Sequence, residues 1–294
     1  MNIESLEKSL LELIRVTSST LPDDIVRAVN KQFEVEDEGS TAKYALGVIK
    51  ENINLAKEKS APLCQDTGTN LYFVNCPQSF PQLDFIKAAQ NATIEATKLG
   101  YLRQNSVDTL SGKNTGNNLG KEAPSFHFHV WEKAETEIKF MMKGGGCENV
   151  GAQYSLPNTN LDAGRDLEGV RKCILDAVIQ AQGKGCGPGI LGICIGGDRG
   201  SGYLASKEQF LRKLDDINPN ETLKTLENTI MTQANKLGIG PMGFGGKTTL
   251  LGCKIDYINR VPASYFVSVS YMCWAFRRQG IVLDSQCNIN NFLY

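Results

Sequence analysis

The hydrophobic and polar positions at the start of the chain repeat with the period of an α-helix. Leu6, Leu10 and Ile14 recur every fourth residue, and charged residues stand between them. Such spacing places the apolar side chains along one stripe of an amphipathic helix. Pro22 and Ser40 mark further helix starts, because proline fits the first turn and serine caps it. The pattern predicts three helices, at about 2–17, 22–33 and 41–58.

Beyond this region, short strand-like runs alternate irregularly with helical patterns. The predicted strands lie at 71–75, 125–132, 136–142, 189–197, 248–258 and 265–274. The predicted helices lie at 82–100, 165–182, 206–215 and 221–237. No regular βαβ repeat, linker or low-complexity segment divides the chain. We therefore expect an α+β fold in a single domain, 1–294, with a helical N-terminal part of about 1–60 followed by mixed α/β lobes.

The run at 125–132 alternates strictly between apolar and polar residues. Phe126 and Phe128 face one way, and His127 and His129 face the other. Together with the run at 136–142, this pattern predicts a β-hairpin whose polar face carries both histidines.

Composition and charge exclude several classes of partner. The chain has 294 residues, 31 basic and 32 acidic side chains and a formal net charge of −1, which does not favour nucleic acid or an anionic membrane surface. No apolar run is long enough for a membrane span, and the N-terminus lacks the features of a signal peptide. We expect a cytoplasmic protein.

Two groups stand out among the nine cysteines. Without a secretion signal, a disulfide framework is not expected. Cys173 lies in a helical pattern, and Cys194 and Cys253 lie in strand-like runs, so all three are predicted to be small core residues. Three others stand in glycine- or aromatic-framed motifs far apart in the sequence: Cys64, Cys186 and Cys273.

Three thiols from such distant motifs meet only when the whole domain folds around them. Three thiolates suit an iron–sulfur cube that leaves one iron without a protein ligand, and such an iron can act as a Lewis acid. A structural zinc site would instead need four ligands in closely spaced pairs, which the chain lacks. A non-catalytic metal- or cluster-binding protein that uses the same thiols stays open as the alternative.

The glycine-rich and arginine-rich motifs favour a small carboxylate over a nucleotide. Gly144–Gly146 matches neither a phosphate-binding loop nor a dinucleotide fingerprint. Bare backbone in this run, with Lys143 and Glu148 beside it, would cradle a small carboxylate. The segment CWAFRR supplies Arg277, whose guanidinium can grip a dicarboxylate.

Taken together and in order, these motifs resemble the α subunit of the iron–sulfur-dependent class I fumarate hydratases and L(+)-tartrate dehydratases. The resemblance runs from about the second helix to the C-terminus. Seven segments carry it: PLCQDTG (62–68), LRQNSV (102–107), GKNTG (112–116), MKGGGCENV (142–150), GCGPGILGICIGG (185–197), LGIGPMGFGGKTT (237–249) and CWAFRR (273–278).

The resemblance implies a cofactor and a site. The lobes would surround a 4Fe–4S cluster with one iron free of protein ligands, held by Cys64, Cys186 and Cys273. Asp66 would be a catalytic residue beside the open iron. The substrate-binding residues would be Gln65, Arg103, Gly146 through its backbone, Lys143 and Arg277.

The chain departs from the family pattern at two places. Val261 follows Arg260 where the family has a substrate-contacting histidine, and Cys186-Gly187-Pro188 replaces the usual Cys-Pro-Pro. The first departure bears on which substrate is used, and both fumarate/malate and tartrate/oxaloacetate stay open.

The resemblance also implies the reaction and the partners. We expect an α subunit of a hydro-lyase that adds or removes water on a four-carbon dicarboxylate. A β subunit of about 200 residues, on a separate chain, would supply a threonine hydroxyl as the base and further cationic anchors. A homodimer of α or an α2β2 assembly is expected.

Overall fold

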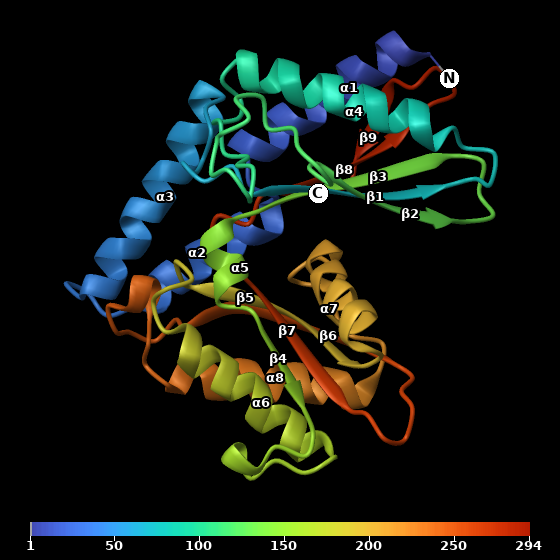
Figure 1. Ribbon diagram of the computed structural model, residues 1–294. Coiled ribbons are helices and arrows are strands. Elements are labelled where there is room, and N and C mark those ends of the chain that lie inside the picture. The colour runs from blue at the N-terminus through green and yellow to red at the C-terminus, as the bar shows by residue number, and fades with distance from the viewer. Residues whose placement is uncertain (1) are drawn as a thin grey trace. The chain divides into compact units, whose positions relative to one another are not determined.

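The computed structural model describes residues 2–294 (Figure 1). Its contacts group the chain into two compact units, each assembled from separate segments. Unit 1 contains the chain up to Asp23, Glu51–Gly145 and Ala275–Tyr294. Unit 2 contains Asp24–Lys50 and Gly146–Trp274.

The first three helices confirm the amphipathic pattern of the sequence. They are α1 (Ile3–Ser19), α2 (Asp23–Val35) and α3 (Thr41–Lys59). Asn2 caps α1 by accepting a hydrogen bond from the Ser5 N–H. Leu6, Leu10 and Ile14 are fully buried, as their spacing predicts. The fold class is confirmed as well, because helices and two mixed sheets follow this helical start.

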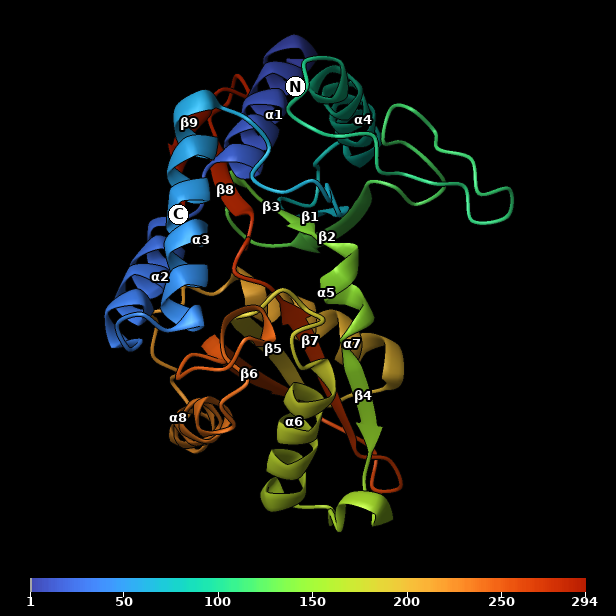
Figure 2. The ribbon, with the colours of Figure 1, turned by 90° about the vertical axis from the view of Figure 1, so that its left-hand side faces the viewer.

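Unit 1 is a five-stranded sheet covered on one face by α1 and α4 (Figures 1 and 2). The strand order is β2-β1-β3-β8-β9. Tyr72, Phe85 and Phe140 fill the core between sheet and helices, with Tyr72 packed against both phenylalanine rings. The elements are β1 (Thr69–Cys76), α4 (Gln82–Lys98), β2 (Ser125–Val130), β3 (Thr136–Lys143), β8 (Arg278–Leu283) and β9 (Ile289–Phe292).

The predicted hairpin of β2 and β3 is wrong. β1 lies between these two strands, parallel to β2 and antiparallel to β3. The predicted alternation holds for Phe126 and Phe128, which pack against the core. His127 stacks on Phe73 of the neighbouring strand, with the ring centroids 4.9 Å apart. Both runs form strands as predicted, but their partner comes from an earlier part of the chain.

Unit 2 is a four-stranded sheet in the order β4-β7-β5-β6. β5 is buried at every position and pairs parallel with β6, as expected for an apolar strand covered on both faces. Helix α7 packs on one face, and α6 and α8 lie on the other (Figure 1). The elements are α5 (Gly145–Asn149, which begins at the last residue of unit 1), β4 (Ala152–Ser155), α6 (Leu167–Ala181), β5 (Gly189–Gly196), α7 (Arg199–Glu208), α8 (Glu221–Lys236), β6 (Leu250–Ile258) and β7 (Phe266–Met272).

Several boundaries differ from the sequence-based prediction. The helix expected at 206–215 starts earlier, as α7 at Arg199, because Asp198 forms a capping box with Ser201. Short elements that carry little periodicity were not predicted: α5, β4, β8 and β9. No helix among residues 2–294 is both long and apolar enough to cross a bilayer.

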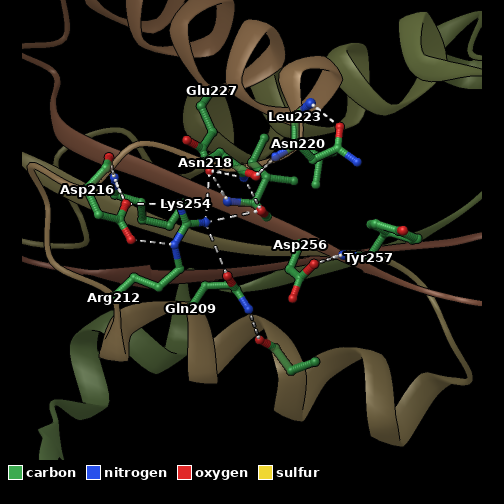
Figure 3. A network of polar contacts seen from close by, with 12 residues as sticks. Gln209, Arg212, Asp216, Asn218, Asn220, Leu223, Glu227, Lys254, Asp256 and Tyr257 are labelled. Atoms are coloured by element: carbon green, nitrogen blue, oxygen red, sulfur yellow. Dashed lines mark hydrogen bonds and ion pairs between the residues drawn. The ribbon is translucent and has the colours of Figure 1, made fainter.

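A network of charged and polar side chains lies beside the sheet of unit 2 (Figure 3). Arg212 donates to both carboxylate oxygens of Asp216, at 2.9 Å each. Lys254, whose side chain is only 5% exposed, donates to the same carboxylate at 2.5 Å. Arg212 also reaches Glu227, which accepts the backbone N–H of Ile255. The network ties α8, β6 and the segment between α7 and α8 together.

Asp216 should therefore stabilise the protein in a pH-dependent way. Burial acts to raise its pKa, but the hydrogen bonds from Arg212 and Lys254 outweigh burial and hold the pKa below 3.8. A carboxyl whose pKa is lowered in the folded state stabilises the protein at neutral pH and loses that contribution as the pH falls through the lowered pKa. We expect Asp216→Asn to cost about 1–2 kcal/mol at pH 7, after allowance for the exposed third of the side chain. The cost should shrink below pH 3.8.

Denaturant unfolding at pH 7 and pH 3 measures this difference. Asp215→Asn is the matched control, because its ion pair with Arg27 is more than half exposed on both sides and should contribute little. If Asp216→Asn lowers the free energy of unfolding by the same amount at both pH values, the prediction is contradicted.

Candidate functional site

Asp66 organises the polar site of unit 1. Its carboxylate accepts hydrogen bonds from the Gly68 N–H at 2.9 Å, the Asn105 side-chain amide at 2.7 Å and the Gly145 N–H at 2.7 Å. These donors come from three segments: the loop before β1, the loop after α4 and the run after β3. The carboxylate is thus held in one orientation without any cation among these three partners.

Two glycines make this arrangement possible. Gly68 has φ +75°, and a Cβ there would lie 2.4 Å from the carbonyl oxygen of Lys143. A side chain at this position would push the loop away from β3. A Cβ on Gly144 would stand 3.1 Å from the Asp66 carboxylate and 3.9 Å from the Arg277 guanidinium. Asp66 and Arg277 therefore lie on the same side of this backbone.

The loop after α4 is fixed to the Asp66 loop through its backbone. The Thr67 hydroxyl donates to the Arg103 carbonyl at 2.7 Å and accepts from the Arg103 N–H at 3.0 Å. The buried Asn118 side chain accepts the N–H groups of Asn105 and Ser106. Figure 2 shows the long loop that follows α4 reaching out from the sheet. The first residues of this loop are fixed next to Asp66 by these hydrogen bonds. Arg103 belongs to this fixed part, and its side chain is exposed.

The remaining predicted residues of unit 1 differ in exposure. Cys64 is half-buried, and its Sγ accepts the Asp66 N–H at 3.4 Å. Gln65 is exposed. Lys143 and Arg277 are 1% and 2% exposed, and the buried Nε of Arg277 has no hydrogen-bond partner among the described residues. A buried guanidinium nitrogen without a partner is costly unless something else pairs with it.

Unit 2 gathers three thiols around one tyrosine. Burial raises the pKa of Tyr271, and electrostatic interactions with Cys273, Cys147 and Cys186 raise it further. The Cys147 thiol donates weakly to the Gly185 carbonyl at 3.9 Å, directly before Cys186. Cys186 is exposed and has φ +54°, whereas Cys273 is 8% exposed. The predicted ligands Cys186 and Cys273 thus share this cluster with Cys147, and Cys64 belongs to unit 1.

Tyr271 was not singled out from the sequence. A Cβ on Gly185, Gly187 or Gly189 would lie 2.4, 3.3 or 2.3 Å from its side chain. Glycine at every second position next to Cys186 was the available signal, because it shows that a large group lies against this backbone. Among the described residues, no three His, Cys, Asp or Glu side chains are already arranged as a metal site.

Arg260 holds the loop that carries Val261 through hydrogen bonds to its backbone. Arg260 donates to the carbonyl oxygens of Val261, Pro262 and Ser264, and its guanidinium lies 4.4 Å from the Tyr265 ring centroid. The Val261 side chain is 64% exposed. A cavity of about 720 Å³ at the ends of β5 and β6 borders the loop.

The predicted core cysteines lie away from solvent. Cys173 and Cys194 are fully buried, and Cys253 is 4% exposed. Burial raises the pKa of Cys173 to about 11 and that of Cys194 to about 12. The interpretation of these three residues as core residues is confirmed.

Comparison with known proteins adds sequence relatives to this geometry. A model of the fumarate hydratase (fumerase) family matches residues 7–282. A Geobacillus stearothermophilus protein, provisionally named a class I fumarate hydratase, is 51% identical over 286 residues, which cover 96% of this chain and 55% of that protein. The chain therefore spans about half the length of this relative.

Two further relatives match almost end to end. A Methanocaldococcus jannaschii protein, provisionally named an L(+)-tartrate dehydratase subunit alpha, is 31% identical over 94% of this chain and 98% of its own length. The L(+)-tartrate dehydratase subunit alpha of Escherichia coli K12 is 28% identical over 98% of this chain and 94% of its own length.

Cysteine reactivity should follow this burial. In metal-free protein at pH 8, iodoacetamide should modify Cys186 while Cys173 and Cys194 stay unmodified until denaturant is added, because only the exposed thiolate reacts. Peptide mass spectrometry over a time course measures each site. Native-state labelling of Cys173 as fast as that of Cys186 would show that the burial seen here is wrong.

Proposed function

The chain belongs to the fumarate hydratase family, and we propose that it is the cluster-bearing α part of a hydro-lyase acting on a four-carbon dicarboxylate. The arrangement around Asp66 carries the proposal. A thiol, a fixed carboxylate and a buried guanidinium with an unpaired Nε all belong to unit 1. An anionic ligand beside Gly144 would give the Arg277 nitrogen the partner that it lacks.

The donor chemistry of the chain fits an iron–sulfur cluster. Cys64, Cys186 and Cys273 supply soft thiolate ligands, and the Asp66 N–H already donates to one of these sulfurs. The cluster would supply an iron that acts as a Lewis acid toward a substrate hydroxyl. The binding of a 4Fe–4S cluster by these three residues is part of the proposal.

The protein's own residues would then orient the substrate and hold its charge. Arg103 and Arg277 would bind carboxylate groups, with Lys143, the Gly146 backbone and Gln65 as further substrate-binding groups. Asp66, fixed by its three donors, would accept or return a proton at the hydroxyl that is lost or gained.

A partner would complete the enzyme. Two relatives are named subunit alpha, and the Geobacillus relative is nearly twice as long as the matched region. We propose a separate β part that supplies the second proton-transfer group, in a cytoplasmic α2β2 or similar assembly. The Geobacillus relative carries a fumarate hydratase name and the other two a tartrate dehydratase name, so a substrate panel must include both pairs.

The thiol assignment is tested by cluster content. After anaerobic reconstitution with iron and sulfide, the wild-type chain should hold about four irons and four sulfides. Serine variants of Cys64, Cys186 or Cys273 should lose most of the visible absorbance, because an alkoxide is a harder ligand than a thiolate. Stoichiometric zinc without sulfide in the wild type would favour the non-catalytic alternative.

Four other cysteines provide the controls. Cys76→Ser, Cys173→Ala and Cys253→Ala should keep the cluster and lose about 1–3 kcal/mol of stability, since all three side chains are buried. Cys147→Ser should also keep the absorbance and alter activity only. If Cys147→Ser removes the cluster while Cys273→Ser keeps it, the third ligand has been assigned wrongly.

The role of Asp66 is tested in the reconstituted complex. Asp66→Asn keeps the size of the side chain, so iron content should be unchanged while kcat falls about 100-fold or more. Asp84→Asn, an exposed change in the first turn of α4, is the control and should leave both quantities unchanged. Full activity of Asp66→Asn with the cluster present would remove Asp66 from the reaction.

A further inference from the structure

A cavity of about 300 Å³ with a mixed polar and apolar lining lies beside Asp66 in unit 1. Asp66, Asn105 and Gly145, which form the hydrogen-bonded arrangement of the candidate site, all border it. Its volume is at the lower end of the range for small-molecule sites. The cavity therefore shares its wall with the carboxylate that the proposed function places in the reaction.

Asn70 also borders this cavity and has an unusual environment. Asn70 is only 5% exposed, and its Oδ1 has no hydrogen-bond partner among the residues that the structure describes. A buried amide oxygen normally has a partner, because leaving one unpaired costs more than most hydrogen bonds contribute. Asn70 lies at the start of β1, where backbone pairing with Met142 fixes its position. A residue that borders the cavity thus has a buried amide oxygen without a partner among the described residues.

The charge of the lining restricts what the cavity accepts. The lining contains the Asp66 carboxylate, amides, hydroxyls and the apolar residues Val107, Ala123 and Pro124, but no lysine or arginine side chain. A carboxylate group entering it would meet a like charge without a counter-ion. A hydroxyl group can donate to the carboxylate and can pair with either end of an amide. The chemistry therefore selects a neutral hydroxyl over a charged group.

We propose that this cavity receives a hydroxyl-bearing carbon of the substrate, and that Asn70 is the residue that recognises the hydroxyl. The inference rests on the proposed function, and it adds a specificity-determining residue to it. The carboxylates of the substrate bind elsewhere, at arginine and backbone groups. Asn70 contributes to the discrimination between hydroxylated dicarboxylates and those without a hydroxyl.

Asn70→Leu is the central test, because leucine keeps the approximate shape of asparagine and removes its hydrogen-bonding atoms. In the reconstituted complex, KM for the hydroxylated substrate should rise ~10-fold or more. The inhibition constant of succinate, which has no hydroxyl, should change less than ~2-fold. The melting temperature should stay equal or rise, since an unpaired buried oxygen is removed. A purely structural asparagine would lower it.

Asn75→Leu is the matched control on the same strand. Asn75 lies an odd number of residues from Asn70, so it faces the other side of the sheet, and its amide already donates to Glu137 at 2.8 Å. This variant should leave both the KM and the succinate inhibition constant unchanged. If Asn70→Leu fails to fold, Asn70→Ser should give a smaller KM rise with the same unchanged succinate inhibition.

The possible failures are distinguishable. Equal shifts for the hydroxylated substrate and for succinate, or an unchanged KM, would overturn the role of Asn70 alone. A lower melting temperature with unchanged kinetic constants would assign Asn70 a structural role. If the wild-type complex turns over no four-carbon hydroxy acid, the proposed function fails and this inference fails with it.

Discussion

A single carboxylate connects the parts of the chain that form the site in unit 1. Asp66 accepts hydrogen bonds from Gly68, Asn105 and Gly145, and the last two lie 39 and 79 positions further along the chain. Three donors satisfy the charge without a paired cation, which leaves the neighbouring arginine available for other anions. The arrangement requires glycine at position 68, since any side chain there would meet the carbonyl of Lys143. The hydrogen bonds to Asp66 thus fix the loop after α4 and the end of β3 beside the cavity.

Local features of the chain could be predicted from the sequence, and non-local ones could not. The three N-terminal helices follow from apolar residues at helical spacing, and β5 follows from a short apolar run. Strand pairing depends on segments that the sequence does not bring together, so β2 and β3 appeared to be a hairpin although β1 separates them. Helix α7 starts at Arg199, before the range 206–215 that the periodicity predicted, because Asp198 caps it there.

The same division holds for the candidate site. Cys64, Asp66 and Cys186 were singled out because their motifs, taken in order with the others, resemble those of the family, and their roles stay predictions. The donors to Asp66 were not, because two of the three are backbone N–H groups, which carry no sequence signal. Asn70 lies one residue before the strand predicted at 71–75, and it was not singled out until its burial and its unpaired oxygen were known. The only sequence signal for Tyr271 was indirect: the alternate glycines next to Cys186 leave space for its ring.

The position of β1 between β2 and β3 also constrains how unit 1 acquires its shape. Thr69 at the start of β1 pairs with Lys143 at the end of β3, so the two segments that hold Asp66 meet only after a long stretch of chain has been closed. Pairings of such high sequence separation form slowly, since the entropy of loop closure is lost before the contacts are gained. A slip of one residue would turn every side chain of the strand to the opposite face. We therefore expect the site of unit 1 to form late in folding, once β1 and β3 have paired in the correct register.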